Sequence, residues 1–296
     1  MSTPPPADVV EVFRSFWRNA CEERGFVLHA VGIDSQVLWL GRAWALLVPA
    51  HSYAEALAQL EVYERENPPR RRAAPAEPLH GAAWTGSLAY AAIILLVGYL
   101  AGTFAFGRDW LGAGALVAGP TRAGEWWRAV TALTLHLDVG HLLANLGFGT
   151  VFGLLAGQLL GAGVAWATVL AAAGTANLVN AFIQPATHSS VGASTAVFAT
   201  LGMLAAYAWR RRHGEGERWA YRWAPLIAGV FLLAFTGAGG ERTDVLAHLT
   251  GFFTGAIAGI AHGTWRVPRG AVAQVAATTA ALAVITGTWV LALGSP

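Results

Sequence analysis

Long apolar runs separated by short polar segments make up most of the chain after residue 82. A helix that crosses a bilayer needs about 20 mostly apolar residues, and most of the runs reach that length. The pattern therefore predicts an all-α polytopic membrane protein, with spans at 83–104, 139–160, 162–183, 191–209, 223–238, 245–263 and 271–293. The span at 223–238 is short and is interrupted by Gly229 and Gly237, so we expect it to tilt or move.

Residues 1–68, before the first span, have the pattern of a small soluble α/β domain. Apolar positions recur there with helical and strand-like periods. Helices are expected at Val9–Glu23 and Ser52–Glu66, and strands at Phe26–Ile33 and Gln36–Val48. Ser52 is the expected N-cap of the second helix. A linker rich in Pro and Arg follows at 69–82.

The composition supports a membrane protein and excludes several other classes. Of the 296 residues, 55% are hydrophobic and only 12% are charged, whereas a soluble domain has about a quarter charged residues. A net charge of +2 gives no reason to expect nucleic-acid binding. Cys21 is the only cysteine, so neither an intrachain disulfide nor a multi-cysteine metal site is expected. We also expect no signal peptide, because the first residues lack a basic start and an apolar run.

Arginine positions predict the orientation. Clusters at 70–72, 210–222 and 266–269 all fall on one side if the N-terminus is inside, as the positive-inside rule requires. We therefore expect a multi-pass membrane protein with a cytoplasmic N-terminus. Residues 105–138 mix Trp with charged residues, which is typical of a long loop in the membrane interface.

Three polar motifs are predicted to converge in the outer leaflet. In this topology the second, fourth and sixth spans all run from outside to inside. His141 and Ser194 lie at the starts of the second and fourth spans, and His248 lies about one turn into the sixth. Polar residues inside a membrane are costly and tend to mark function. We therefore expect these side chains to form one site, open to the outer side.

Ser194 and His248 are the candidate nucleophile and general base. A helix start has free backbone N–H groups and a partial positive charge, which would stabilise an oxyanion beside Ser194. Gly251 and Gly255 share a helical face with His248, so the fourth span could approach closely and bring the hydroxyl to the imidazole. The alternatives are a serine that caps its helix and a buried histidine that bonds to a neighbouring helix.

His141 and Asn145 are candidate donors to the oxyanion. They are four residues apart, so they share one helical face, and both side chains can donate hydrogen bonds. Interhelical bonding is the alternative. His136 is expected in the loop near the site. A zinc or haem site built from His136, His141 and His248 would leave Ser194 unexplained and lacks a His-Glu-x-x-His motif, so no metal and no cofactor are expected.

Together these motifs resemble the rhomboid family of intramembrane serine proteases, over roughly 83–263. The resemblance implies a six-helix protease core, with 271–293 as an additional seventh transmembrane helix and 1–68 as a cytosolic domain. It also implies that the membrane is a bacterial inner (cell) membrane. It implies a Ser194–His248 dyad with His141 and Asn145 at the oxyanion. The supporting residues that it implies are Gly192, Phe198, Gly251, Gly255, His136, Trp127 and Arg128.

Two positions depart from the family pattern. Thr195 replaces a glycine that usually follows the serine, and its branched side chain is expected to narrow the oxyanion pocket. Phe198 replaces a tyrosine that stacks on the base, so the stacking is expected without the hydroxyl.

The sequence therefore predicts an endopeptidase that cuts transmembrane segments of other membrane proteins within the lipid bilayer. Asp244 lies four residues before His248, but it is expected to face the interface and is not assigned to the site. The predicted gate comprises 223–238 and Gly237–Gly240, and the predicted water routes are Gln184–Ser190 and 238–244. A non-proteolytic relative that binds transmembrane helices is the alternative, with Thr195 in its favour. A transporter is disfavoured because charged residues are missing from the span centres and no repeat relates the two halves.

Overall fold

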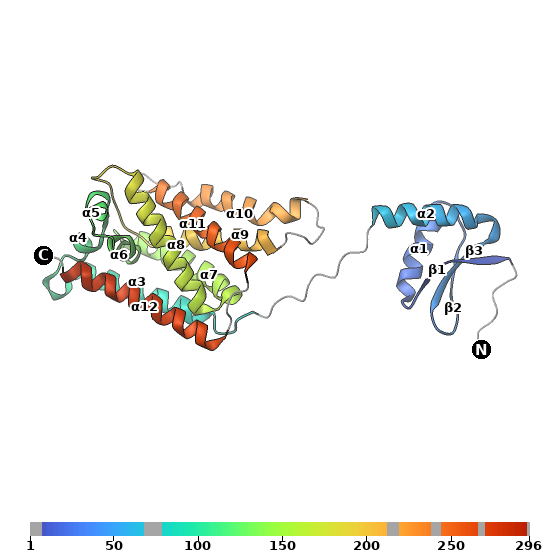
Figure 1. Ribbon diagram of the computed structural model, residues 1–296, viewed down its shortest axis with the longest axis horizontal. Coiled ribbons are helices and arrows are strands. Elements are labelled where there is room, and N and C mark those ends of the chain that lie inside the picture. Colours follow the sequence, from blue (N-terminus) through green and yellow to red (C-terminus); the bar gives the residue numbers. More distant parts are fainter. Residues whose placement is uncertain (1–7, 68–78, 212–218, 238–243, 266–269, 295–296) are drawn as a thin grey trace. The chain divides into compact units, whose positions relative to one another are not determined.

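The computed structural model of the chain describes residues 8–67, 79–211, 219–237, 244–265 and 270–294. It divides into two compact units, Met1–Ala73 and Ala74–Pro296 (Figure 1). The predicted linker at 69–82 falls largely outside the described residues. The same holds for the water route at 238–244, for the 238–240 part of the gate, and for most members of the arginine clusters.

The described part of the N-terminal unit is a three-stranded antiparallel sheet packed against two helices. Its elements are β1 (Val9–Ser15), α1 (Arg18–Ala30), β2 (Gln36–Trp39), β3 (Trp44–Pro49), a 3-10 turn (Ala50–Ser52) and α2 (Tyr53–Glu66). The strand order is β1-β3-β2, with β3 in the centre. Its side chains Leu46 and Val48 are buried with Cys21 and Leu28 of α1 and Leu60 of α2.

Two predicted elements of this unit are wrong. The chain is extended over Val9–Ser15, where a helix was predicted, because β1 pairs with the central strand β3 across a bulge near Val12. The strand predicted at Phe26–Ile33 is mostly the second half of α1, in which Leu28 is buried and Phe26 is exposed. The apolar residues of such short, irregularly spaced segments fit both the helical and the strand period. Pairing across the sheet decides between helix and strand.

The other two predicted elements are present with altered detail. Gln36–Val48 is not one strand but the hairpin of β2 and β3, which turns at Gly41 with a φ of +81°. The helix predicted at Ser52–Glu66 is confirmed as α2, and Ser52 occupies its N-cap position. The Ser52 side chain makes no capping hydrogen bond, so it does not stabilise the helix in the way expected.

Among its described residues, the second unit has seven long helices, at or near the positions of the seven predicted spans. They are α3 (Trp84–Gly102), α7 (Val139–Leu160), α8 (Ala162–Ile183), α9 (Ser194–Arg211), α10 (Trp219–Gly237), α11 (Val245–Thr264) and α12 (Ala271–Gly294). Among the described residues, α3, α7, α8, α11 and α12 are long and apolar enough to cross a membrane. Helix α10 is apolar over the shorter stretch Trp219–Phe235, and α9 ends on Arg210 and Arg211. The chain is therefore a multi-pass integral membrane protein.

Residues 105–138, predicted as a long loop, are folded into short elements. These are a 3-10 turn (Ala105–Gly107), α4 (Trp110–Gly114), β4 (Leu116–Val117), α5 (Ala118–Arg122), α6 (Arg128–Thr131) and a second 3-10 turn (Ala132–Thr134). Strand β4 pairs antiparallel with β5 (Ser189–Ser190), which lies in the loop between α8 and α9. The segment that leads into α7 is thus hydrogen-bonded to the segment that leads into α9.

Among the described elements, α9 and α11 share the most extensive contact, as expected from the predicted glycine stripe. A Cβ atom added to Gly255 would overlap the Ala199 carbonyl oxygen, and one added to Gly202 would overlap the Phe252 carbonyl oxygen. Gly251 and Gly259 face α9 carbonyls in the same way. Small residues let the two backbones touch, and in a membrane this packing replaces the hydrophobic driving force between helices.

A single methyl group added to α11 tests how closely the two helices pack. We expect Gly255→Ala to lower the free energy of unfolding by about 1–3 kcal/mol, because the added carbon overlaps the backbone of α9. Gly147→Ala on α7 is the matched control, since a Cβ there meets nothing within 4 Å. Its better helix propensity should leave stability unchanged or raise it by up to about 1 kcal/mol. Unfolding in mixed micelles, followed by circular dichroism, measures both, and equal effects would contradict the close packing.

Candidate active site

Ser194 is the first residue of α9, and the two residues before it fix its position. Gly192 has a φ of +139°, which a side chain would disfavour. The Gly192 N–H donates to the Ala132 carbonyl oxygen at 2.9 Å, and the Ala193 N–H points to His136 Nε2 at 3.5 Å. Ser194 itself is half-buried. The segment before α7 therefore holds the start of α9 in place.

The side chains of His141 and Ser194 both lie close to Gly192. A Cβ atom added to Gly192 would lie 2.8 Å from His141 Nε2 and 3.5 Å from Ser194 Oγ. His141 is in the first turn of α7, where its N–H donates to the capping carboxylate of Asp138 at 2.8 Å. The structure thus brings together an imidazole and a hydroxyl from two predicted motifs, and the missing side chain at Gly192 makes room for both.

His248 comes from α11 and faces the same turn of α9. Its ring is 4.4 Å from the Phe198 ring, centroid to centroid, and only 7% of the residue is exposed. Phe198 lies four residues after Ser194, and Gly251, three residues after His248, faces the Thr195 carbonyl oxygen. Both contacts place the imidazole at the level of the Ser194 turn. The two rings are in contact but inclined by 36°, so the expected stacking takes the form of a tilted contact.

Thr195, the main departure from the family pattern, turns toward α11. The residue is 4% exposed, and its methyl group would lie 3.3 Å from a Cβ on Gly251. The bulk added beside Ser194 therefore packs against the glycine of the neighbouring helix.

Asn145 is buried four residues after His141. Its Nδ2 donates to the His141 carbonyl oxygen at 3.0 Å, which uses one of its two amide hydrogens. The backbone carbonyl oxygen of Asn145 in turn accepts a hydrogen bond from the Tyr90 hydroxyl of α3 at 2.8 Å. Tyr90 was not singled out from the sequence, although a buried tyrosine in an apolar span was a signal that could have found it.

His136 lies beside His141, as expected of a loop near the site. The two rings are 5.1 Å apart, edge to face. Burial, and next the proximity of His141, lower the pKa of His136 to about 4. At neutral pH this ring is therefore uncharged, and its Nε2 can accept the Ala193 N–H just before Ser194.

Trp127 and Arg128 support the segment that leads to His136. The Arg128 Nη1 donates to the carbonyl oxygens of Gly112 and Ala115 at 2.9 and 2.8 Å, and its Nε pairs with Glu125. Trp127 packs against an apolar cluster around Trp110, Leu135 and Trp289. These two residues thus organise the polypeptide between α3 and α7.

Asp244 joins the loop before α9 to the start of α11, a contact that the sequence did not reveal. Its Oδ1 accepts the Ala247 N–H at 3.0 Å and caps α11. Its Oδ2 accepts from His188 Nε2 at 2.8 Å and from Asn180 Nδ2 at 3.0 Å. Part of the predicted water route at Gln184–Ser190 is therefore fixed to the helix of His248.

The electrostatics of this contact favour an ionised Asp244. Burial alone would raise the pKa of its carboxyl group, but hydrogen bonds from the Ala247 N–H, His188 and Asn180 outweigh burial and lower the pKa below its usual 3.8. A charged capping residue also interacts favourably with the N-terminal dipole of α11.

Comparison with known proteins points to one family. The Rhomboid domain family matches residues 123–264. Rhomboid-like protease 2 of Toxoplasma gondii is 31% identical over 147 residues, which is 50% of this chain and 51% of that protein. Rhomboid-like protease 3 of the same organism is 33% identical over 135 residues, 44% of this chain and 49% of that protein. Rhomboid protease GluP of Bacillus subtilis (strain 168) is 35% identical over 81 residues, 27% and 16% of the two chains. The chain spans about half the length of its Toxoplasma relatives.

The Asp244 contact predicts that the free energy of unfolding depends on pH. Because the folded-state pKa is lowered, the carboxylate stabilises the protein above pH ~4 and the effect is lost as the pH falls through the lowered pKa. At neutral pH we expect Asp244→Asn to cost about 1–2 kcal/mol, since its bonds to His188 and Asn180 lose their charge.

Thermal unfolding measured between pH ~7 and ~3 checks this prediction. Asp244→Asn should be less sensitive to acid than the wild type. Asp138→Asn is the control, because Asp138 is the equivalent cap of α7 and its carboxylate accepts the His141 N–H. This variant should lose as much stability in acid as the wild type does. An unchanged acid transition in Asp244→Asn would show that the carboxylate does not stabilise the loop.

Proposed function

The chain belongs to the rhomboid family, and we propose that it is an intramembrane serine endopeptidase that cleaves transmembrane segments of other membrane proteins. The observation that carries the proposal is the meeting of three helix ends, at which Ser194, His141 and His248 lie around Gly192 and Phe198. A hydroxyl, a buried imidazole and further hydrogen-bond donors are what acyl transfer needs.

In this mechanism His248 is the general base and Ser194 the nucleophile. His248 accepts the hydroxyl proton as Ser194 Oγ attacks the scissile carbonyl carbon. Collapse of the tetrahedral intermediate transfers that proton to the leaving amine and leaves an acyl-enzyme ester. Water, deprotonated by the same imidazole, then releases the new carboxyl terminus. Packing against Phe198 restricts the ring orientation of His248.

The oxyanion is bound by His141, by Asn145 and by the backbone N–H of Ser194. His141 approaches Ser194 across Gly192. Asn145 has one amide hydrogen left after its bond to the His141 carbonyl oxygen. The start of α9 adds the partial positive charge of a helix N-terminus, which favours the developing negative charge. Donors held in place before the reaction stabilise the transition state without reorganising.

We place the active site toward the outer side of a bacterial inner membrane, with the N-terminus in the cytoplasm. In this layout helices α3 and α7–α11 form the six-helix protease core, and α12 is the additional seventh helix. Residues 1–68 form the cytosolic domain. The substrates are membrane proteins, and they enter laterally from the bilayer past α10.

Labelling by a fluorophosphonate tests the nucleophile without a known substrate. We expect one adduct on Ser194 in detergent, and no labelling of Ser194→Ala or His248→Ala, because one variant lacks the nucleophile and the other lacks the base. Asn145→Ala should label about 100- to 1,000-fold more slowly, the usual effect of losing one oxyanion donor.

Ser190→Ala is the matched control for this experiment. Ser190 is a nearby half-buried serine of β5, paired with Leu116 of β4. It should label like the wild type. An unlabelled but well-folded wild type would instead support a relative that binds transmembrane helices without cutting them, and Thr195→Gly would then be the first variant to examine.

A reversible crosslink between α10 and α7 tests lateral entry. Leu232 of α10 and Phe152 of α7 both pack against the apolar cluster around Phe198 and Leu233, so cysteines at these positions can be joined by a reducible bis-thiol crosslinker that spans the cluster. We expect the crosslink to suppress cleavage of a fluorogenic transmembrane peptide in proteoliposomes, and reduction to restore it. Labelling by the small fluorophosphonate should persist throughout. Unchanged peptide cleavage in the crosslinked protein would contradict a gate at α10.

A further inference from the structure

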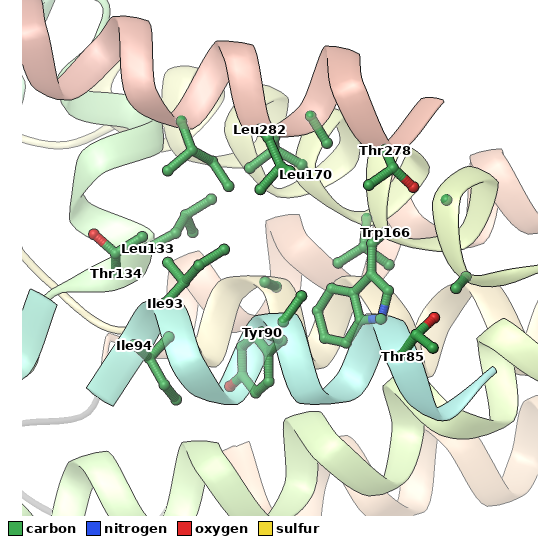
Figure 2. A pocket seen from close by; sticks show the side chains of 18 residues that line it. Thr85, Tyr90, Ile93, Ile94, Leu133, Thr134, Trp166, Leu170, Thr278 and Leu282 are labelled. Carbon is green, nitrogen blue, oxygen red and sulfur yellow. The ribbon is translucent and has the colours of Figure 1, made fainter. Parts of the chain in front are cut away.

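Helix α12 buries side chains at one end only. Thr288, Trp289 and Ala292 are its buried residues, and all three lie in its last two turns, on the side of the unit where α4 and α6 contact it (Figure 1). The middle of the helix borders a cavity of about 210 Å³ instead. Figure 2 shows Leu282 of α12 over this cavity, with Thr134 at one end of it. The side chains that α12 buries most completely therefore lie beside the segment that leads to α7.

Trp289 is hydrogen-bonded to that segment. Its Nε1 donates to Thr134 Oγ1 at 3.1 Å, and both residues are buried. The Thr134 hydroxyl donates in turn to the Thr131 carbonyl oxygen at 2.7 Å, so two partners fix its orientation. A buried indole N–H needs an acceptor, and water is scarce inside a membrane. The bond therefore fixes the second 3-10 turn, Ala132–Thr134, relative to α12.

The ring of Trp289 is enclosed by the folded segment between α3 and α7. It lies 4.9 Å from the Trp110 ring of α4, centroid to centroid. A Cβ atom added to Gly114 would lie 2.5 Å from its Cη2 atom, so the ring leaves no room for a side chain there. The buried Leu135 belongs to the same apolar cluster, and Val191 packs against that cluster. Trp289 thus shares a cluster with the residues that directly precede His136 and Gly192.

The same turn holds the start of α9. The Ala132 carbonyl oxygen accepts the Gly192 N–H at 2.9 Å, and His136 Nε2 faces the Ala193 N–H at 3.5 Å. Both amides directly precede Ser194, whose own N–H is a proposed oxyanion donor. A displaced turn would move these contacts, and a donor that is not held in place stabilises a transition state less well.

We propose that Trp289 of the seventh helix is a positioning residue for the active site. Through the Thr134 hydroxyl it fixes the turn that binds Gly192, and thereby the place at which the Ser194 N–H meets the oxyanion. Trp289 itself does not touch the reacting atoms. The inference rests on the proposed function and adds to it a role for α12 in the rate of the chemical step.

Removal of the indole N–H tests the proposal in the full-length protein. Trp289→Phe keeps an aromatic ring and removes the donor. We expect the maximal rate of fluorophosphonate labelling to fall by about fivefold, the factor that one hydrogen bond of typical net strength gives. The probe concentration at half-maximal rate should stay unchanged, because probe binding precedes the need for oxyanion donors. A mere loss of folded protein would lower the labelled fraction and not the rate.

Trp84→Phe is the matched control, because Trp84 is an exposed indole at the start of α3. It should label like the wild type. Equal rates for Trp289→Phe and Trp84→Phe would overturn the proposal.

Substitutions of Thr134 show whether Trp289 acts through this hydroxyl. Thr134→Val removes the acceptor and should slow labelling at least as much as Trp289→Phe does, whereas Thr134→Ser keeps a hydroxyl and should restore most of the rate. In the Thr134→Val protein, Trp289→Phe should change the rate by less than about twofold, because the bond is already absent. Effects of the two substitutions that simply multiply would overturn the assignment to this bond.

Hydrogen exchange separates this inference from the proposed function, because it requires no activity. The Gly192 amide, which donates to the Ala132 carbonyl oxygen, should exchange about fivefold faster in Trp289→Phe than in the wild type or in Trp84→Phe. Mass spectrometry with fragmentation that resolves single amides measures the rate. An unlabelled wild type would contradict the proposed function and leave this amide to decide the inference. Unchanged exchange at Gly192 would overturn it.

Discussion

The close contact between α9 and α11 is the constraint on which the site depends. Glycines on each helix face carbonyl oxygens on the other, so the two backbones cannot slide or rotate without a clash. Ser194 stands at the start of one helix and His248 one turn into the other. Their relative height is therefore set by backbone contact rather than by flexible side chains. Gly192 extends the same principle to α7, because the absence of a side chain lets the His141 ring approach the serine.

The membrane unit could be predicted from the sequence far better than the N-terminal unit. For α7, α8, α11 and α12 the length of an apolar run was sufficient, because a bilayer sets the length of a spanning helix whatever its partners are. For residues 9–33 nothing comparable to the bilayer sets the length of each element. There β1 was predicted as helix and much of α1 as strand, because a few apolar residues fit either period until the central strand β3 selects one. The order in residues 105–138 was missed for a related reason, since Arg128 bonds to carbonyl oxygens of Gly112 and Ala115 that carry no sequence signal.

Some features of the candidate site could also be predicted from the sequence, and others could not. The approach of His141 to Ser194, and the approach of α11 to α9, followed from topology and from a visible glycine stripe. The residues that hold these groups in place were missed. Tyr90 bonds to a backbone atom 55 positions away, and Asp244 bonds to His188 and Asn180, which are 56 and 64 positions away. Such pairs become visible only after folding, because the two partners lie far apart in the sequence.

Hydrolysis inside a membrane requires polar groups that remain satisfied where water is scarce, and the structure shows how the fixed part of the unit meets this requirement. Asn145 and Tyr90 bond to backbone atoms, and the Asp244 carboxylate accepts three hydrogen bonds. Helix α10 is held differently. It packs on α9 chiefly through side chains such as Leu233, and it contains Pro225. Apolar side chains can exchange neighbours for lipid at little cost, because lipid tails are as apolar as leucine. A helix held in this way can move aside while the polar site stays assembled, which is why lateral entry past α10 is compatible with a rigid α9–α11 contact.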